Sequence, residues 1–307
     1  MLQQTLNRSF SLEGKGLHSG LNLKVKFNPA QENHGYKIKR IDIEGEPIIA
    51  ALAENVSGTQ RGTVLSENGV SISTVEHALA ALYACQIDNC LIEVNGPEIP
   101  IMDGSSIEYI RKIKEIGLKK QLDKRKYISF KRKKIFVKDT DTGSSILMLP
   151  NENLEISAEI SFNSPLLSKQ KAKLNLLNEF SREFASARTF VFVKEIIKLL
   201  EGGLIKGGDL DNAIVIYDTP LAQTDFDKLA EIMNVKKRPA EKLGYIMNKP
   251  LKYDNEPARH KILDILGDLA LSGGFVNGKI IAKCPGHKIN TLFAKEIRKH
   301  YMAEKNK

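Results

Sequence analysis

Two short stretches carry the residue types from which metal-dependent hydrolases build their sites. In "STVEHALAAL" (73–82), Glu76 and His77 are neighbours in the first turn of a predicted helix. In "EPARHKILDILGDLALSGG" (256–274), His260 and Asp264 stand four residues apart and therefore share one face of a helix. Two histidines and one carboxylate could supply the three protein ligands of a catalytic zinc, which keeps a fourth position open.

Hydrolysis at such a metal also needs a base for the attacking water and an acid for the leaving group. Glu76 lies beside a candidate ligand and suits the base. His287 follows an apolar stretch in "KIIAKCPGHKIN" (279–290), in a loop led by glycine, where catalytic residues often occur. Simpler interpretations stay open: Ser73-x-x-Glu76 matches a capping box, a lone buried histidine is usually a core residue, and Asp264 could pair with Lys261.

The helices that must position these residues are marked by their apolar periodicity. The first has a core-facing stripe on one side and small residues on the other, which predicts burial on both sides; the stripe is Val75, Ala78, Leu79 and Leu82, and the small residues are Ala80, Ala81 and Ala84. The second begins near Pro257 and ends at Gly273–Gly274. Asp268 joins His260 and Asp264 on its polar face.

Composition describes an ordinary globular chain of 307 residues, with 42% hydrophobic and 27% charged residues. The N-terminus lacks the layout of a signal peptide, and no apolar run is long enough to span a membrane. Three cysteines give neither a disulfide framework nor a CxxC pattern, so we expect a cytoplasmic, reduced protein. The net charge of +9 has three possible explanations: nucleic acid binding, an anionic small substrate, or a solvated lysine-rich surface. The densest basic run, 119–138, has only three aromatics, and they fit strand alternation, which favours a solvated segment there.

The same basic run predicts a linker and an edge strand, and hence a boundary between a first domain (1–122) and a second (123–307). Alternating residues predict strands at 21–27 and 154–162, and apolar runs predict strands near 90–95 and 212–218. A helix is expected from about Ser105, with a capping box to Glu108, and another over 192–203. Each half therefore offers strands followed by amphipathic helices, which indicates two similar α+β units, although the residues themselves show no convincing internal repeat.

Seven motifs in order resemble one family, the zinc-dependent UDP-3-O-acyl-N-acetylglucosamine deacetylases of lipid A biosynthesis. They are "GKGLHSG" (14–20), "STVEHALAAL" (73–82), "NGPEIPIMDGSS" (95–106), "SARTF" (186–190), "GGDLDNAIV" (207–215), "RHKILDILGDL" (259–269) and "GHK" (286–288). The resemblance covers nearly the whole chain. It implies two similar α+β domains, each a sheet with packed helices, with the helices sandwiched between the two sheets.

The resemblance also assigns roles. It makes His77, His260 and Asp264 the zinc ligands, although iron(II) also suits such a set. It implies Glu76 as general base and His287 as general acid, with Asp268 orienting His287. Further roles fall to Thr189 as the hydroxyl that meets the developing oxyanion, to Lys261 facing the substrate diphosphate, and to Phe190 and Phe192 lining the acyl passage. Taken alone, Thr189 would be a strand-end residue, the two phenylalanines core residues and Asp103 a turn residue.

The implied reaction is hydrolysis of the 2-acetamido group of a UDP-linked, 3-O-acylated glucosamine, by a protein that works near a membrane pathway. Two alternatives remain: a zinc amidohydrolase of another acylated amino sugar, and a non-catalytic nucleotide-sugar binder with the same fold. Pro257–Ala258 and Ser164 depart from the family pattern outside the metal ligands and bear on substrate fit. Some members are fused to a hydroxyacyl-carrier-protein dehydratase, and we expect this chain to end before such a domain.

Overall fold

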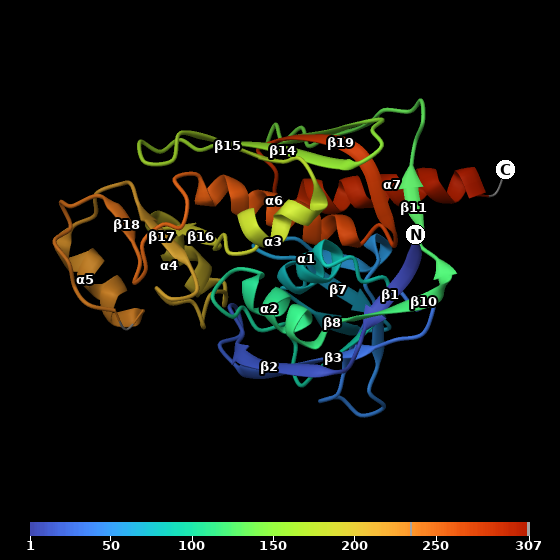
Figure 1. The fold of residues 1–307 in the computed structure, drawn as a ribbon. Coiled ribbons are helices and arrows are strands. Elements are labelled where there is room, and N and C mark those ends of the chain that lie inside the picture. Colours follow the sequence, from blue (N-terminus) through green and yellow to red (C-terminus); the bar gives the residue numbers. More distant parts are fainter. Residues whose placement is uncertain (234, 306–307) are drawn as a thin grey trace.

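The chain forms two similar α+β units whose helices lie between two sheets, as the sequence predicts (Figure 1). The computed structural model describes residues 1–233 and 235–305. The sheet of the first unit has the order β2-β3-β9-β4-β5, with strands Phe10–Lys15, Asn22–Pro29, Cys90–Val94, Tyr36–Arg40 and Ile48–Ala50. The sheet of the second has the order β12-β13-β19-β14-β15, with strands Ile135–Lys138, Ser145–Leu149, Phe275–Lys283, Leu154–Ser161 and Lys169–Leu174.

The two sheets have the same topology, although the two halves of the sequence show no convincing repeat. In each, the last strand in sequence enters the middle, antiparallel to the second strand and parallel to the third. The outer pairs are antiparallel in both sheets. A small three-stranded sheet is inserted after the fourth strand of each unit, and a helix, the central strand and a second helix follow.

The helices that carry the predicted site are equivalent in this repeat. The first unit contributes α1 (Glu76–Ala84) and α2 (Ile107–Ile116), and the second contributes α6 (Glu256–Ala270) and α7 (His287–Lys305). Helix α1 packs directly on α6 in the middle of the molecule (Figure 1). Every residue of α1 from Glu76 to Tyr83 is buried, which confirms the prediction of two buried sides. The units therefore meet through the helices that hold the candidate ligands.

The inserted sheets lie beside this interface. In the first unit the insert is β6 (Val56–Gly58), β7 (Val64–Glu67) and β8 (Val70–Ile72). In the second it is a lobe at one side of the molecule (Figure 1), with strands β16 (Phe190–Phe192), β17 (Ile214–Tyr217) and β18 (Gly244–Ile246) and helices α4 (Val193–Glu201) and α5 (Gln223–Ile232). The lobe has its own small apolar core. A short helix, α3 (Phe180–Glu183), and 3-10 turns at Ala53–Asn55 and Leu177–Glu179 complete the elements.

The basic run joins the two units as strands. Strand β10 (Leu118–Lys124) pairs with β1 (Leu2–Leu6), and β11 (Tyr127–Ser129) runs parallel to β19. The third strand of the run, β12, is an edge strand as expected. The position of the domain boundary between residues 122 and 123 stays a prediction. Over the described residues, no helix combines the length and the hydrophobicity that crossing a bilayer requires.

Candidate metal centre and active site

The three candidate ligands converge where α1 crosses α6. One ligand atom from each of His77, His260 and Asp264 lies within 4.8 Å of the other two, and all three residues are buried. The Asp264 Oδ1 atom is 3.2 Å from His260 Nε2 and 3.9 Å from His77 Nε2. Residues separated by almost two hundred positions in the sequence therefore form one cluster, with one ligand from the first unit and two from the second.

The chemistry of this cluster fits a divalent cation. Asp264 Oδ1 and His77 Nδ1 are buried without any hydrogen-bond partner among the described residues, a costly state for polar atoms unless something else satisfies them. His260 Nδ1 lies 3.0 Å from the carbonyl oxygen of Ala187 and would donate its proton there, which leaves the Nε2 lone pair toward the cluster.

The protonation states agree with metal binding. Burial lowers the pKa of His77 to about 3 and also lowers that of His260, so both imidazoles are neutral. Burial alone would raise the pKa of the Asp264 carboxyl, but the positive charge around it, including the Lys261 ammonium, holds it well below its usual range. Two neutral imidazoles and one carboxylate are a donor set for zinc or iron(II).

Glu76 and His287 face each other beside this cluster. Glu76 Oε1 is 3.7 Å from His287 Nε2, and Asp268 Oδ2 is 3.0 Å from His287 Nδ1 on the far side of the ring. Burial raises the pKa of Glu76 to about 7. Burial would lower the pKa of His287, but the nearby carboxylates, Asp268 first, raise it to about 9. A carboxylate and an imidazolium can therefore coexist near neutral pH, and a bound cation would oppose the rise in the Glu76 pKa.

A cavity of about 220 Å³ brings most of the predicted residues together. Eight of the ten line it: Glu76, His77, Thr189, Phe190, His260, Lys261, Asp264 and His287. Asp268 lies behind His287, fully buried. Phe192 lines neither this cavity nor the apolar one beside it, and packs against Phe162 with 5.2 Å between ring centroids. Its substrate contact stays a prediction.

Lys261 and Thr189 sit at the wall of this cavity. Lys261 Nζ is 2.7 Å from Asp264 Oδ2, so the helix salt bridge left open by the sequence does form, and it leaves Oδ1 free for the cluster. Thr189 immediately precedes β16; its N–H donates to the Gly104 carbonyl at 2.8 Å, and its carbonyl accepts from the Ile214 N–H at 2.8 Å. These backbone bonds hold Thr189 at the junction of this cavity and an apolar cavity.

The apolar cavity extends from Thr189 and Phe190 into the lobe of the second unit. It is lined by both of these residues and by Leu17, Ile196, Leu199, Ile205 and Val215. The ring of Phe190 also lies 5.3 Å from the Lys261 ammonium. An apolar recess that opens beside a polar, metal-competent cavity suits a substrate with one polar and one alkyl part.

Some local interpretations were wrong. Neither predicted capping box forms: the Ser73 N–H donates to the Pro97 carbonyl, and the Ser105 hydroxyl donates to the Asp103 carboxylate. Thr74 has a φ of 57°, outside the helical region, so α1 begins only at Glu76. The Glu76 carboxylate is thus free to face the cavity. His287 is the first residue of α7 rather than part of a loop.

Sequence reasoning missed two residues that hold the candidate acid–base pair, Glu76 and His287. Thr63 is fully buried, and its N–H donates to Glu76 Oε2 at 3.0 Å. Asn290 donates from Nδ2 to Asp268 Oδ2 at 3.0 Å. Thr63 lies in a loop without periodicity, and only its place between "GLHSG" and "STVEH" could have drawn attention to it. Asn290 lies three residues after His287, one helical turn away, which is a signal that the sequence does contain.

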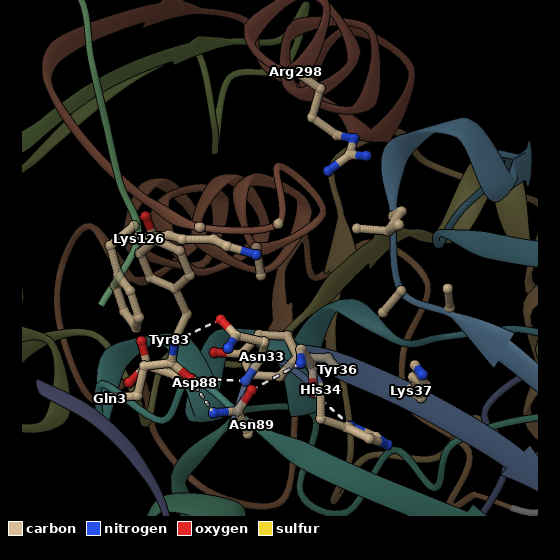
Figure 2. Close-up of a pocket in the computed structure, with 18 of the residues that line it drawn as sticks. Gln3, Asn33, His34, Tyr36, Lys37, Tyr83, Asp88, Asn89, Lys126 and Arg298 are labelled. Atoms are coloured by element: carbon tan, nitrogen blue, oxygen red, sulfur yellow. Dashed lines mark hydrogen bonds between the residues drawn. The ribbon is translucent and has the colours of Figure 1, made fainter. Parts of the chain in front are cut away.

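A third cavity, of about 360 Å³, lies away from the cluster, and none of the predicted residues lines it (Figure 2). Three of its polar side chains bond to one another: Asn89 donates to Gln3 at 2.7 Å, and Gln3 donates to Asn33 at 2.9 Å. Satisfied amides offer less to a reacting substrate than the unpartnered atoms of the cluster. The cavity of about 220 Å³ that contains the cluster is therefore the candidate active site.

Comparison with known proteins identifies the family of the chain. Residues 3–233 and 240–299 match the family described as LpxC: UDP-3-O-acyl N-acetylglycosamine deacetylase. The chain belongs to this family. A relative from Geotalea uraniireducens, named UDP-3-O-acyl-N-acetylglucosamine deacetylase, is 36% identical over 296 residues, which cover 96% of this chain and 88% of the relative.

Other members of the deacetylase family are longer. Proteins from Porphyromonas gingivalis and Bacteroides thetaiotaomicron, both named bifunctional enzyme LpxC/FabZ, are 55% and 56% identical over 297 residues. The alignment covers 97% of this chain and 64% of each relative, so the chain spans less than two thirds of the length of these bifunctional proteins.

Proposed function

We propose that the protein hydrolyses the 2-acetamido group of a UDP-linked, 3-O-acylated N-acetylglucosamine and releases acetate, as a step of lipid A biosynthesis. The convergence of His77, His260 and Asp264 beside Glu76 and His287 in one cavity carries this proposal. Membership of the deacetylase family supports an acylated amino sugar as the substrate class.

Zn²⁺ is the metal we assign, with Fe²⁺ as the alternative for the same donor set. His77, His260 and Asp264 would hold it. When bound, the ion would supply Lewis acidity that polarises the amide carbonyl and makes water more acidic.

The side chains around the cluster would carry the proton transfers. Glu76 takes a proton from the attacking water, and the Thr189 hydroxyl donates a hydrogen bond to the carbonyl oxygen as negative charge develops there. His287 gives the proton on Nε2 to the nitrogen as the C–N bond breaks. Asp268 keeps the imidazolium oriented from the Nδ1 side. One water and one amide thus become acetate and a free amine.

Substrate recognition would use the two parts of the cavity system. Lys261 lies beside the catalytic cavity and supplies positive charge for the diphosphate, and a net charge of +9 favours an anionic substrate. The acyl chain would enter the apolar cavity past Phe190, with Phe192 in support. A cytoplasmic enzyme that works close to the membrane surface fits a product that goes on to a membrane lipid.

Metal analysis combined with an acetate-release assay tests the proposal. Wild-type protein should contain one zinc or iron per chain and release acetate from the UDP-linked substrate that carries a 3-O-acyl chain, and His260→Ala should lose the metal and the activity. Equal rates on the substrate without its 3-O-acyl chain would point to another acylated amino sugar. A metal-free wild-type protein that binds the nucleotide sugar without turnover would identify a binder instead.

A further inference from the structure

Thr63 makes hydrogen bonds to both halves of the acid–base pair. It ends the loop between β6 and β7 and has no exposed surface. Its N–H donates to Glu76 Oε2 at 3.0 Å, and its hydroxyl donates to Asp268 Oδ1 at 2.5 Å. The same hydroxyl oxygen lies 3.3 Å from His287 Nδ1. One residue thus contacts the proposed base, the proposed acid and the carboxylate behind the acid.

These contacts leave the Asp268 carboxylate no freedom to rotate. Its Oδ2 atom is bound by His287 Nδ1 and by Asn290 Nδ2, each at 3.0 Å. Its Oδ1 atom accepts a hydrogen bond from the Thr63 hydroxyl and from no other donor among the described residues. Without that hydroxyl, Oδ1 would be a buried anionic oxygen with no donor, and the carboxylate would turn toward another partner. The His287 ring follows, because Asp268 holds it through Nδ1.

The loop that carries Thr63 is itself tightly placed. Gly62 lies against the base: a Cβ atom there would come within 3.2 Å of Glu76 Oε1. Arg61 has a φ of 63° and forms an ion pair with Glu195 of α4 at 2.6 Å. The short path from the backbone nitrogen of Thr63 to its hydroxyl then sets the spacing between its two carboxylate partners.

We propose that Thr63 is a positioning residue that sets the separation and orientation of Glu76 and His287 through its amide and its hydroxyl. The inference rests on the proposed function, since it gives these two residues the roles of base and acid. Thr63 itself touches no reacting atom. It acts through Glu76 and Asp268, so its loss should slow turnover without weakening substrate binding.

Thr63→Val tests the hydroxyl alone, because valine has nearly the same shape and keeps the backbone N–H to Glu76. We expect kcat to fall by about 10²-fold, the loss typical of a misplacement of about 1 Å, while KM and metal content stay within twofold of wild type. Thr63→Ser restores the hydroxyl and should recover most of kcat. Thr5→Val is the matched control: Thr5 is buried, and its hydroxyl donates to the Asn89 carbonyl at 2.7 Å, far from the cavity.

A spectroscopic measurement separates positioning from general loss of structure. In protein with 15N-labelled histidine, the Nδ1 proton of His287 between Asp268 and Thr63 should give a downfield NMR signal. We expect Thr63→Val to shift or broaden this signal, and Thr63→Ser and Thr5→Val to leave it as in wild type. If Thr63→Val does not fold with wild-type metal content, Thr63→Ala replaces it in both measurements.

Three results would overturn the inference: an unchanged kcat and NMR signal in the variant without a hydroxyl, a serine variant as slow as the valine variant, or a change confined to KM. Failure of the proposed function would look different, because wild-type protein would then release no acetate. The His287 signal would still report whether the Thr63 hydroxyl holds the ring.

Discussion

Gly267 is the position where we expect the smallest chemical change to have the largest effect. It lies on α6 against the backbone of α1, and a Cβ atom added there would stand 2.1 Å from the carbonyl oxygen of Glu76 and 2.7 Å from its carbonyl carbon. Favourable contacts between heavy atoms need about 3.5 Å, so α1 and α6 would have to separate by roughly 1 Å. Helix propensity alone predicts the opposite outcome, a gain of about 1 kcal/mol for Gly→Ala in a helix interior.

The expected sign follows from comparing the two effects. Forcing an extra methyl group into a packed interface costs about 1–3 kcal/mol, and here the obstacle is backbone rather than a flexible side chain, which favours the upper end. We therefore expect Gly267→Ala to lower the free energy of unfolding by about 1–2 kcal/mol after the propensity gain. Because the proposed metal ligands are divided between these helices, a shift of about 1 Å should also reduce kcat by roughly 10²-fold.

Urea denaturation and steady-state kinetics on the same preparations measure both effects. Gly202→Ala is the matched control: Gly202 ends α4 with a φ of −76°, and its added methyl would meet nothing nearer than 3.3 Å. The control should keep the stability and the kcat of wild type. A Gly267→Ala protein as stable and as active as wild type would refute the claim that this glycine sets the spacing of the two helices.

Three further predictions concern single side chains. Glu76→Ala should keep the metal but lose about 10²-fold or more in kcat, and turnover within twofold of wild type would exclude Glu76 as the base. Asp268→Asn should move the alkaline limb of the kcat/KM profile to lower pH. The proposed acid, His287, must be protonated; its pKa is raised to about 9 mainly by Asp268 against the lowering effect of burial, and the variant removes that counter-charge. An unmoved limb would mean that another group titrates there. Arg188→Met should lower the free energy of unfolding by about 3–5 kcal/mol, because it leaves the buried carboxylate of Glu256 without the cation 2.8 Å away, and a loss below 1 kcal/mol in urea denaturation would contradict this.

Helical periodicity in the sequence is sufficient to predict which residues of α6 face the cavity. His260, Asp264 and Asp268 recur at intervals of four on a helix whose other side is apolar, so they had to share a polar face. His260 and Asp264 line the cavity, Asp268 contacts His287 from behind, and His77 meets the first two because α1 is buried on both sides. Helical periodicity is a local property, so the shared face of these residues can be predicted from their spacing in the sequence.

Features that depend on distant backbone contacts were not predictable. The Ser73–Glu76 spacing matches a capping box, but the Ser73 N–H donates its hydrogen bond to the Pro97 carbonyl instead of to Glu76. Thr63 reaches Asp268 across 205 residues, and no spacing within its own loop encodes that contact. The shared topology of the two sheets was hidden for the same reason, since strand order is a matter of long-range pairing rather than of any strand's own pattern.

The division of the ligands between the two units has a thermodynamic consequence. His77 belongs to the first half of the chain, whereas His260 and Asp264 belong to the second, so an ion held by all three is bound only while the halves are docked. Metal affinity and docking are then linked functions: free metal stabilises the docked arrangement by RT ln(1 + [M]/Kd), and a change that strains the α1–α6 contact weakens the affinity to the extent that it lowers the docked fraction of the metal-free protein. The dissociation constant for the metal is therefore also a gauge of how well the two halves fit together.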